Sequence, residues 1–154
     1  MRKEVVNPFI SAATSVFLQE YKLVLSRKSL TTKSSPIPSL AVAVSIGVTG
    51  KLKGMVVYSM SEQMAYALAA LLMPDKSPET IKKHTDSVIG EMGNVITGQV
   101  TMALDEDLGI DCDITPPFIH RGENMTTNYL ELETIVLTAL CDLGELEINI
   151  SLTE

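Results

Sequence analysis

A chain of 154 residues with 45% hydrophobic and 20% charged residues is long enough to bury a core, and we expect one domain over residues 1–154. The net charge of −7 argues against binding to nucleic acid, which needs a concentrated basic surface. The longest nearly apolar run, Met64 to Met73, is too short to span a membrane, and the first residues lack the pattern of a signal peptide. We therefore expect a cytoplasmic protein without a membrane partner.

The first predicted element is a helix. Asn7 followed by Pro8 is typical of a helix start, with Asn7 as the cap, and the apolar spacing continues to about Glu20. The alternation from Tyr21 to Ser26 then predicts a strand. The polar, proline-containing stretch from Ser29 to Ser39 predicts a loop.

Two strands and a helix follow. The stretches 41–48 and 51–60 are rich in β-branched residues, and Thr49-Gly50 between them predicts a hairpin turn. Ser61 is a good cap for a second helix, which Pro74 ends.

A long third helix is predicted from Ser77-Pro78-Glu79, which combines a cap, a proline at the first position and an acidic first turn. We expect this helix to fray by Leu104, because the carboxylates of residues 105–107 oppose the dipole at a helix carboxyl end. Gly109 then supplies a stop signal.

The last part of the chain predicts strands. Residues 111–120 form an edge strand or a bend, because Pro116-Pro117 prevents regular central pairing. Residues 134–141 and 145–152 form a hairpin around 142–144. The predicted order is αβββααβββ. Since the strands come in hairpin groups, the fold class is α+β, with helices packed on a mainly antiparallel sheet.

Several chemistries are disfavoured. His84 and His120 have no Cys or carboxylate at ligand spacing, so we expect no metal site and place both at the surface or in loops. Cys112 and Cys141 are expected to be reduced thiols. The methionines, several of them between Met55 and Met73, are expected to fill the core; a ligand pocket lined by them is an alternative without positive support.

One face of the third helix is polar. At about 100° per residue, Ser87, Glu91, Asn94, Gly98 and Thr101 share an arc opposite the apolar residues of the helix. A carboxylate and a carboxamide at i and i+3 can touch one small target.

Three glycines, Gly90, Gly93 and Gly98, lie on or beside this arc although each weakens a helix by about 1 kcal/mol relative to alanine. Two explanations remain open: something approaches the helix closely, or another helix packs against the glycines.

The arrangement resembles a known family. Ser87, three residues, Glu91, two residues, Asn94, 22 residues and Pro117 reproduce the signature of the CheC/CheX chemotaxis phosphatases. The order of elements resembles CheX most closely. A second E-x-x-N match, Glu4 to Asn7, has no serine four positions earlier, and we interpret it as a chance match with Glu4 outside the helix.

The resemblance implies removal of the phosphoryl group from the aspartate of a response-regulator receiver domain such as CheY. It implies that Asn94 orients the attacking water, that Glu91 pairs with the receiver's lysine, and that Ser87, Gly98 and Pro117 support the helix or the interface. Mg²⁺ would come with the receiver, and no cofactor is expected here.

The resemblance also implies a homodimer joined through the sheets. A non-catalytic adaptor or sensor that binds a receiver domain or a flagellar-switch component is the alternative function.

Overall fold

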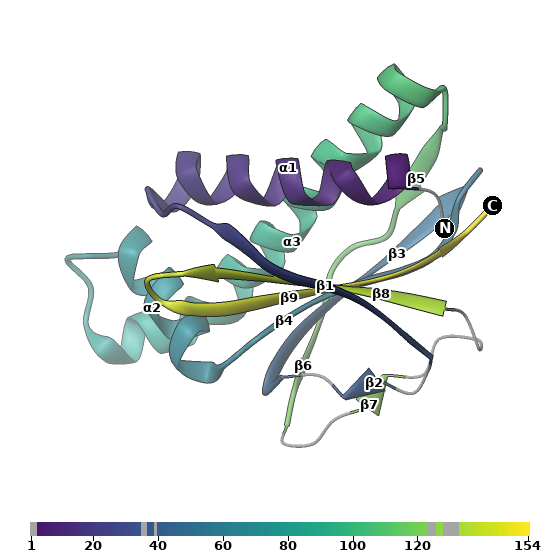
Figure 1. Ribbon diagram of the computed structural model, residues 1–154. Helices are drawn as coiled ribbons and strands as arrows, with labels where there is room; N and C mark the ends of the chain where they lie inside the picture. The colour runs from purple at the N-terminus through teal and green to yellow at the C-terminus, as the bar shows by residue number, and fades with distance from the viewer. Residues whose placement is uncertain (1–2, 35–36, 39, 123–125, 128–132) are drawn as a thin grey trace.

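The computed structural model describes residues 3–34, 37–38, 40–122, 126–127 and 133–154. Helices α1 and α3 cover one face of an open sheet, and the short β2–β7 ribbon lies on the other side (Figure 1). In chain order the elements are α1 Lys3–Tyr21, β1 Ser26–Ser34, β2 Ile37–Pro38, β3 Val42–Gly50, β4 Lys53–Met60, α2 Glu62–Leu72, α3 Pro78–Leu108, β5 Cys112–Ile114, β6 Phe118–Arg121, β7 Thr126–Thr127, β8 Glu133–Cys141 and β9 Gly144–Thr153.

The sheet is antiparallel in every described pairing. Its strand order is β1-β8-β9-β4-β3-β5, and β6 also pairs with β3. The predicted α+β class is therefore confirmed, as are both predicted hairpins, β3–β4 and β8–β9. The turn predicted at Thr49-Gly50 is misplaced: both residues belong to β3, and the chain turns at Lys51-Leu52. Residues 111–120 form two short strands on β3, with the bend between them at Pro116-Pro117.

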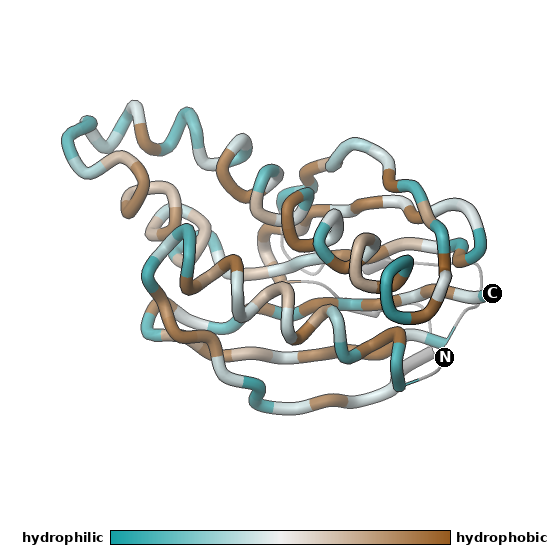
Figure 2. The backbone as a smooth tube through the Cα atoms, turned by 90° about the horizontal axis from the view of Figure 1, so that it is seen from above, coloured by the Kyte–Doolittle hydropathy of each residue, from teal (hydrophilic) through white to brown (hydrophobic). Residues whose placement is uncertain are grey.

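The face of the sheet beneath the helices is apolar. Four alternating residues of β9 point into the core, and all are buried: Leu146, Ile148, Ile150 and Leu152. Hydrophobic and hydrophilic residues also alternate along the helices (Figure 2), as expected for amphipathic helices packed on a sheet. Met60, Met64 and Met92 are buried in the same core, in agreement with the core-filling prediction.

The predicted start of α1 is wrong. The helix begins at Lys3, so Glu4 is helical and Pro8 lies inside the helix, not at its first position. Pro8 removes one backbone hydrogen bond, which costs about 3 kcal/mol. Val5 and Val6 are buried on the inner face, and each contributes about 1.5–3 kcal/mol, which offsets that cost.

The strand predicted at residues 21–26 and the loop predicted at 29–39 are also wrong. Tyr21 ends α1, Lys22 adopts a left-handed φ of 58°, and β1 occupies residues 26–34 at the edge of the sheet. β1 is exposed along most of its length, so its sequence lacks the apolar alternation of a half-buried strand. Pro38 belongs to β2, while Pro36 and Ser39 lie outside the described residues.

The predicted helix caps are confirmed. The hydroxyl of Ser61 accepts a hydrogen bond from the amide of Met64 at 3.1 Å, and α2 ends at Leu72, before Pro74. The hydroxyl of Ser77 accepts from the amide of Thr80 at 3.3 Å at the start of α3.

The carboxyl end of α3 extends further than predicted, to Leu108 rather than Leu104. Gly109 adopts a left-handed φ of 64° and caps the helix. The ammonium of Lys51 donates to the carbonyl of Gly109 at 3.0 Å. This cation compensates for the acidic residues 105–107, which explains why the last turn does not fray.

Helix α3 approaches the sheet very closely at Gly93. A Cβ atom on Gly93 would lie 3.1 Å from Val44 Cγ1 and 3.2 Å from Tyr58 Cδ2. The hydroxyl of Thr97 donates to the carbonyl of Gly93 at 2.7 Å, so the buried hydroxyl of Tyr58, 2.7 Å from Thr97 Oγ1, acts as the donor to Thr97. This contact fixes both the height and the rotation of α3 on the sheet.

We predict opposite effects for alanine at two glycines of α3. Gly93→Ala will lower the free energy of unfolding by about 1 kcal/mol, because overpacking against the fully buried Val44 and Tyr58 outweighs the gain in helix propensity. Gly98→Ala, where a Cβ meets nothing within 4 Å, will raise it by up to about 1 kcal/mol. Urea denaturation measures both; equal changes of the same sign would contradict the packing described for Gly93.

Candidate functional site

The exposed face of α3 carries the residues singled out by the sequence. Ser87 and Glu91 are exposed, while Asn94 and Gly98 are half-buried. The opposite face, including Ile89 and Ile96, is buried. We call the four residues Ser87, Glu91, Asn94 and Gly98 the α3 strip. Because its helix is fixed on the sheet, the strip is held in a defined orientation.

Glu91 and Asn94 lie at i and i+3 on this strip, a spacing that places their Cβ atoms about 5–6 Å apart. Within the part of the chain that the structure describes, neither side chain makes a hydrogen bond or an ion pair. Their polar groups therefore remain available to a partner. A carboxylate only accepts hydrogen bonds, whereas a carboxamide both donates and accepts.

Pro117 lies against one side of α3, although 22 residues separate it from Asn94 in the motif. A Cβ atom on Gly90 would lie 3.6 Å from Pro117 Cγ, so the proline packs one turn from Asn94. Thr115 fixes the bend that leads to it: its amide donates to the carbonyl of Gly47 at 2.9 Å, and its hydroxyl accepts from the amide of Gly47 at 2.8 Å.

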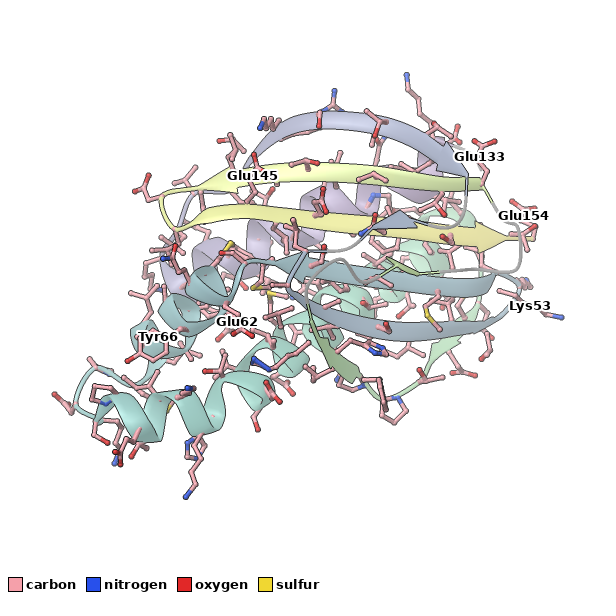
Figure 3. The ribbon with its side chains drawn as sticks, turned by 90° about the horizontal axis from the view of Figure 1, so that it is seen from below. Lys53, Glu62, Tyr66, Glu133, Glu145 and Glu154 are labelled. Carbon is pink, nitrogen blue, oxygen red and sulfur yellow. The ribbon has the colours of Figure 1, made fainter. Side chains whose placement is uncertain are left out.

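Ion pairs also connect strand β6 to helices α2 and α3. The guanidinium of Arg121 contacts Glu62 at 2.9 Å and Asp86 at 2.5 Å. Glu62 and Tyr66 lie on α2, next to the first turns of α3 (Figure 3). The segment carrying Pro117 is thus held between Thr115 and Arg121.

The other side of the strip is formed by α1 and α2. Val16, Glu20 and Tyr21 of α1 and Leu72 of α2 surround a cavity beside Glu91. Burial, followed by the carboxylates of Glu20 and Glu91, raises the pKa of Tyr21 to about 12. No motif in the sequence indicated these residues, because they come from other helices.

The strip also extends toward the carboxyl end of α3. Met102, four residues after Gly98, is 63% exposed, and no sequence motif singled it out. An exposed methionine in line with the strip is an adaptable apolar contact for a partner.

The predicted packing of another helix on the glycines is wrong, because the neighbours of Gly93 and Gly90 belong to the sheet and to the segment before β6. Gly93 packs against the sheet, and a Cβ atom added to Gly90 would meet Pro117 and Ile119 at ordinary van der Waals distances. Gly98 faces open space, which leaves room for close approach from outside.

The second E-x-x-N match lies on a helix after all. Glu4 and Asn7 are both exposed on α1, and with Asp107 of α3 they line a cavity of about 500 Å³. The prediction that Glu4 lies outside the helix is wrong, because α1 begins at Lys3. The pair presents the same two side chains at the same spacing on a different helix, so it can serve as a natural control for the α3 strip.

The described residues do not support the other kinds of site that were considered from the sequence. No group of His, Cys, Asp or Glu there could hold a metal ion. His84 and His120 are exposed, as predicted. Cys112 and Cys141 are unpaired and half-buried. None of the described helices is long and apolar enough to cross a membrane.

Comparison with solved structures first defines the class of protein. A CheC-like superfamily protein from a Shewanella species matches with a TM-score of 0.86 at 22% identity, covering 100% of both chains. The structure of the CheX-CheY-BeF₃-Mg²⁺ complex from Borrelia burgdorferi contains a chain that matches with a TM-score of 0.82 at 26% identity, covering 99% of this chain and 100% of that one. The fold is that of the CheC-like proteins.

Comparison of sequences then identifies the family. The profile of the family described as chemotaxis phosphatase CheX matches residues 42–140, and the chain belongs to this family. The CheY-P phosphatase CheX of Thermotoga maritima is 35% identical over 98 residues, which are 64% of this chain. The match spans 62% of that relative, less than two thirds of its length.

Proposed function

We propose that this protein is a phosphatase that removes the phosphoryl group from the aspartate of a CheY-like receiver domain. Membership of the CheX family, the activity named for the Thermotoga relative and the complex named for the Borrelia relative support this proposal. The observation that carries it is the α3 strip, where Glu91 and Asn94 stand unpaired among the described residues on a helix that the core holds rigidly.

Asn94 is the proposed catalytic residue. In the reaction, a water oxygen attacks phosphorus in line with the bond to the receiver's aspartate; that bond breaks, leaving a carboxylate and inorganic phosphate. Such a transfer depends mainly on positioning. The carboxamide of Asn94 accepts a hydrogen bond from this water and donates one to a phosphoryl oxygen. It does not act as a general base, because an amide does not ionise near neutral pH.

Glu91 is the proposed docking residue. Its carboxylate, one turn from Asn94, pairs with the lysine of the receiver's active site and fixes the register in which Asn94 enters. A charge-assisted contact of this kind is directional enough to orient one protein on another.

Mg²⁺ belongs to the receiver in this proposal, where it neutralises charge on the phosphoryl group. The described residues of this chain hold no cluster of ligands for it. We propose that the protein has no cofactor of its own.

The other motif residues support the interface. Gly98 leaves open space in which the partner's backbone can approach α3. Pro117 shapes the segment beside Gly90, and Ser87 extends the polar surface by one turn. These three roles concern docking and not the transfer itself.

The decay of phosphorylated receiver domains from the same organism, with Mg²⁺, tests the proposal. The wild-type protein will accelerate decay of at least one receiver, and Glu91→Ala/Asn94→Ala will lose about a hundredfold or more of that acceleration, because the water is no longer positioned. Both side chains lack partners among the described residues, so the double variant will keep the unfolding free energy of the wild type within about 0.5 kcal/mol.

The matched control is Glu4→Ala/Asn7→Ala, which removes the same pair of side chains from an exposed face of α1. It will leave the decay rate unchanged. If a receiver binds but decays at its intrinsic rate with the wild type, the protein is an adaptor and the phosphatase proposal is wrong.

We also propose that the protein forms a homodimer through its sheet. β1 is an edge strand that pairs with β8 on one side, and among the described strands nothing pairs with its other side. Light scattering at micromolar concentration will give twice the chain mass of 16.7 kDa. A mass equal to that of one chain under these conditions would show that the proposed dimer is wrong.

A further inference from the structure

A cavity opens directly beside Glu91. Its volume is about 280 Å³, and it lies between the carboxyl ends of α1 and α2 and the middle of α3. Pockets for small-molecule ligands are generally larger, roughly 300–1,000 Å³. This volume admits one long side chain of a partner, and the chemistry of the lining defines which kind.

The walls of the cavity are apolar and its mouth is acidic. Val16, Met92 and Val95 line the interior, and the first two are almost fully buried. The exposed Glu20 and Glu91 stand at the mouth. An apolar wall below carboxylates is complementary to a side chain with an aliphatic stem and a cationic end.

The acidic mouth is not neutralised from within the described part of the chain. Besides burial, the carboxylates of Glu20 and Glu91 both raise the pKa of Tyr21, which lines the same cavity, and neither carboxylate makes an ion pair with a described residue. The neighbouring cation, Lys22, donates to the backbone carbonyl of Gln19 at 3.1 Å. Two like charges near one hydroxyl favour the approach of a positive group from outside.

Leu72 extends the apolar surface outward. It is the last residue of α2, it lines the cavity, and it is 44% exposed. A stem entering the cavity would remove part of this surface from water, which favours binding.

We propose that this cavity binds a second basic side chain of the receiver domain, a lysine or arginine near the one that Glu91 contacts, with its stem on the apolar walls and its cationic end at Glu20. Glu20 is then a specificity-determining residue that selects which receivers dock. The inference rests on the proposed function for the nature of the partner. It adds a carboxylate from α1 and a cavity that the sequence motif does not include.

The test is a binding titration of the wild type and variants with a labelled receiver domain carrying beryllofluoride and Mg²⁺. Glu20→Lys will raise Kd about tenfold or more, and Glu20→Gln about threefold, because one carboxylate is lost without a change of shape. The control Glu106→Lys makes the same change of charge at an exposed position in the last turn of α3, and its Kd will stay within about twofold of the wild type.

A second pair of variants tests the apolar wall. Leu72→Ala will raise Kd about threefold, whereas Leu71→Ala, at a residue that is 46% exposed and does not line the cavity, will not. Replacing each surface lysine and arginine of the receiver by alanine will identify the occupant. Its replacement will weaken binding to the wild type and have no further effect with Glu20→Gln.

The outcomes separate this inference from the proposed function. Binding that is unchanged by Glu20→Lys, or weakened equally by Glu106→Lys, overturns the inference, as does failure of the wild type to bind any receiver. Binding that depends on Glu20 without accelerated decay upholds the docking site and overturns the phosphatase. At a saturating concentration of the Glu20→Gln variant, the phosphorylated receiver will decay at a rate within about twofold of that measured with the wild type. The substitution weakens docking and leaves the transfer step unchanged.

Discussion

The contact of α3 with the sheet at Gly93 is the constraint on which the site depends. A Cβ atom at position 93 would lie only 3.1 Å from Val44 Cγ1, so glycine allows the helix to approach the sheet without displacing its neighbours, and the Tyr58 hydroxyl holds Thr97 in one position. Burial raises the pKa of the Tyr58 hydroxyl above its ordinary value. This hydroxyl therefore stays protonated, and can donate its hydrogen bond, at any physiological pH. With one face of the helix fixed in this way, the opposite face can present Glu91 and Asn94 without their being held by any described neighbour.

Most of the fold follows from local signals, and the errors have identifiable physical causes. The β3–β4 hairpin and the start of α3 were predictable because runs of β-branched residues and a Ser-Pro cap act over a few residues. β1 was not predictable, because an exposed edge strand takes its stability from pairing with β8 and carries little pattern of its own. The start of α1 was misplaced because burial of Val5 outweighs the local effect of Pro8.

The candidate site also has a part that was predictable from the sequence and a part that was not. Glu91 and Asn94 share a face because of helical periodicity, so the sequence alone placed them together. The motif also contained Pro117, but only the tertiary structure shows that it packs on Gly90. Glu20 and Leu72 join the site from two other helices, and no spacing in the sequence could indicate them.

The central claim is that Asn94 acts on the reaction while Glu91 acts on docking. Single variants separate the two when decay of the phosphorylated receiver at saturation and Kd for its beryllofluoride form are measured together. We predict that Asn94→Ala loses rate at saturation while its Kd stays near that of the wild type, and that Glu91→Ala mainly raises Kd. Wild-type rate at saturation for Asn94→Ala would contradict the account, because the carboxamide would then have no part in positioning the water.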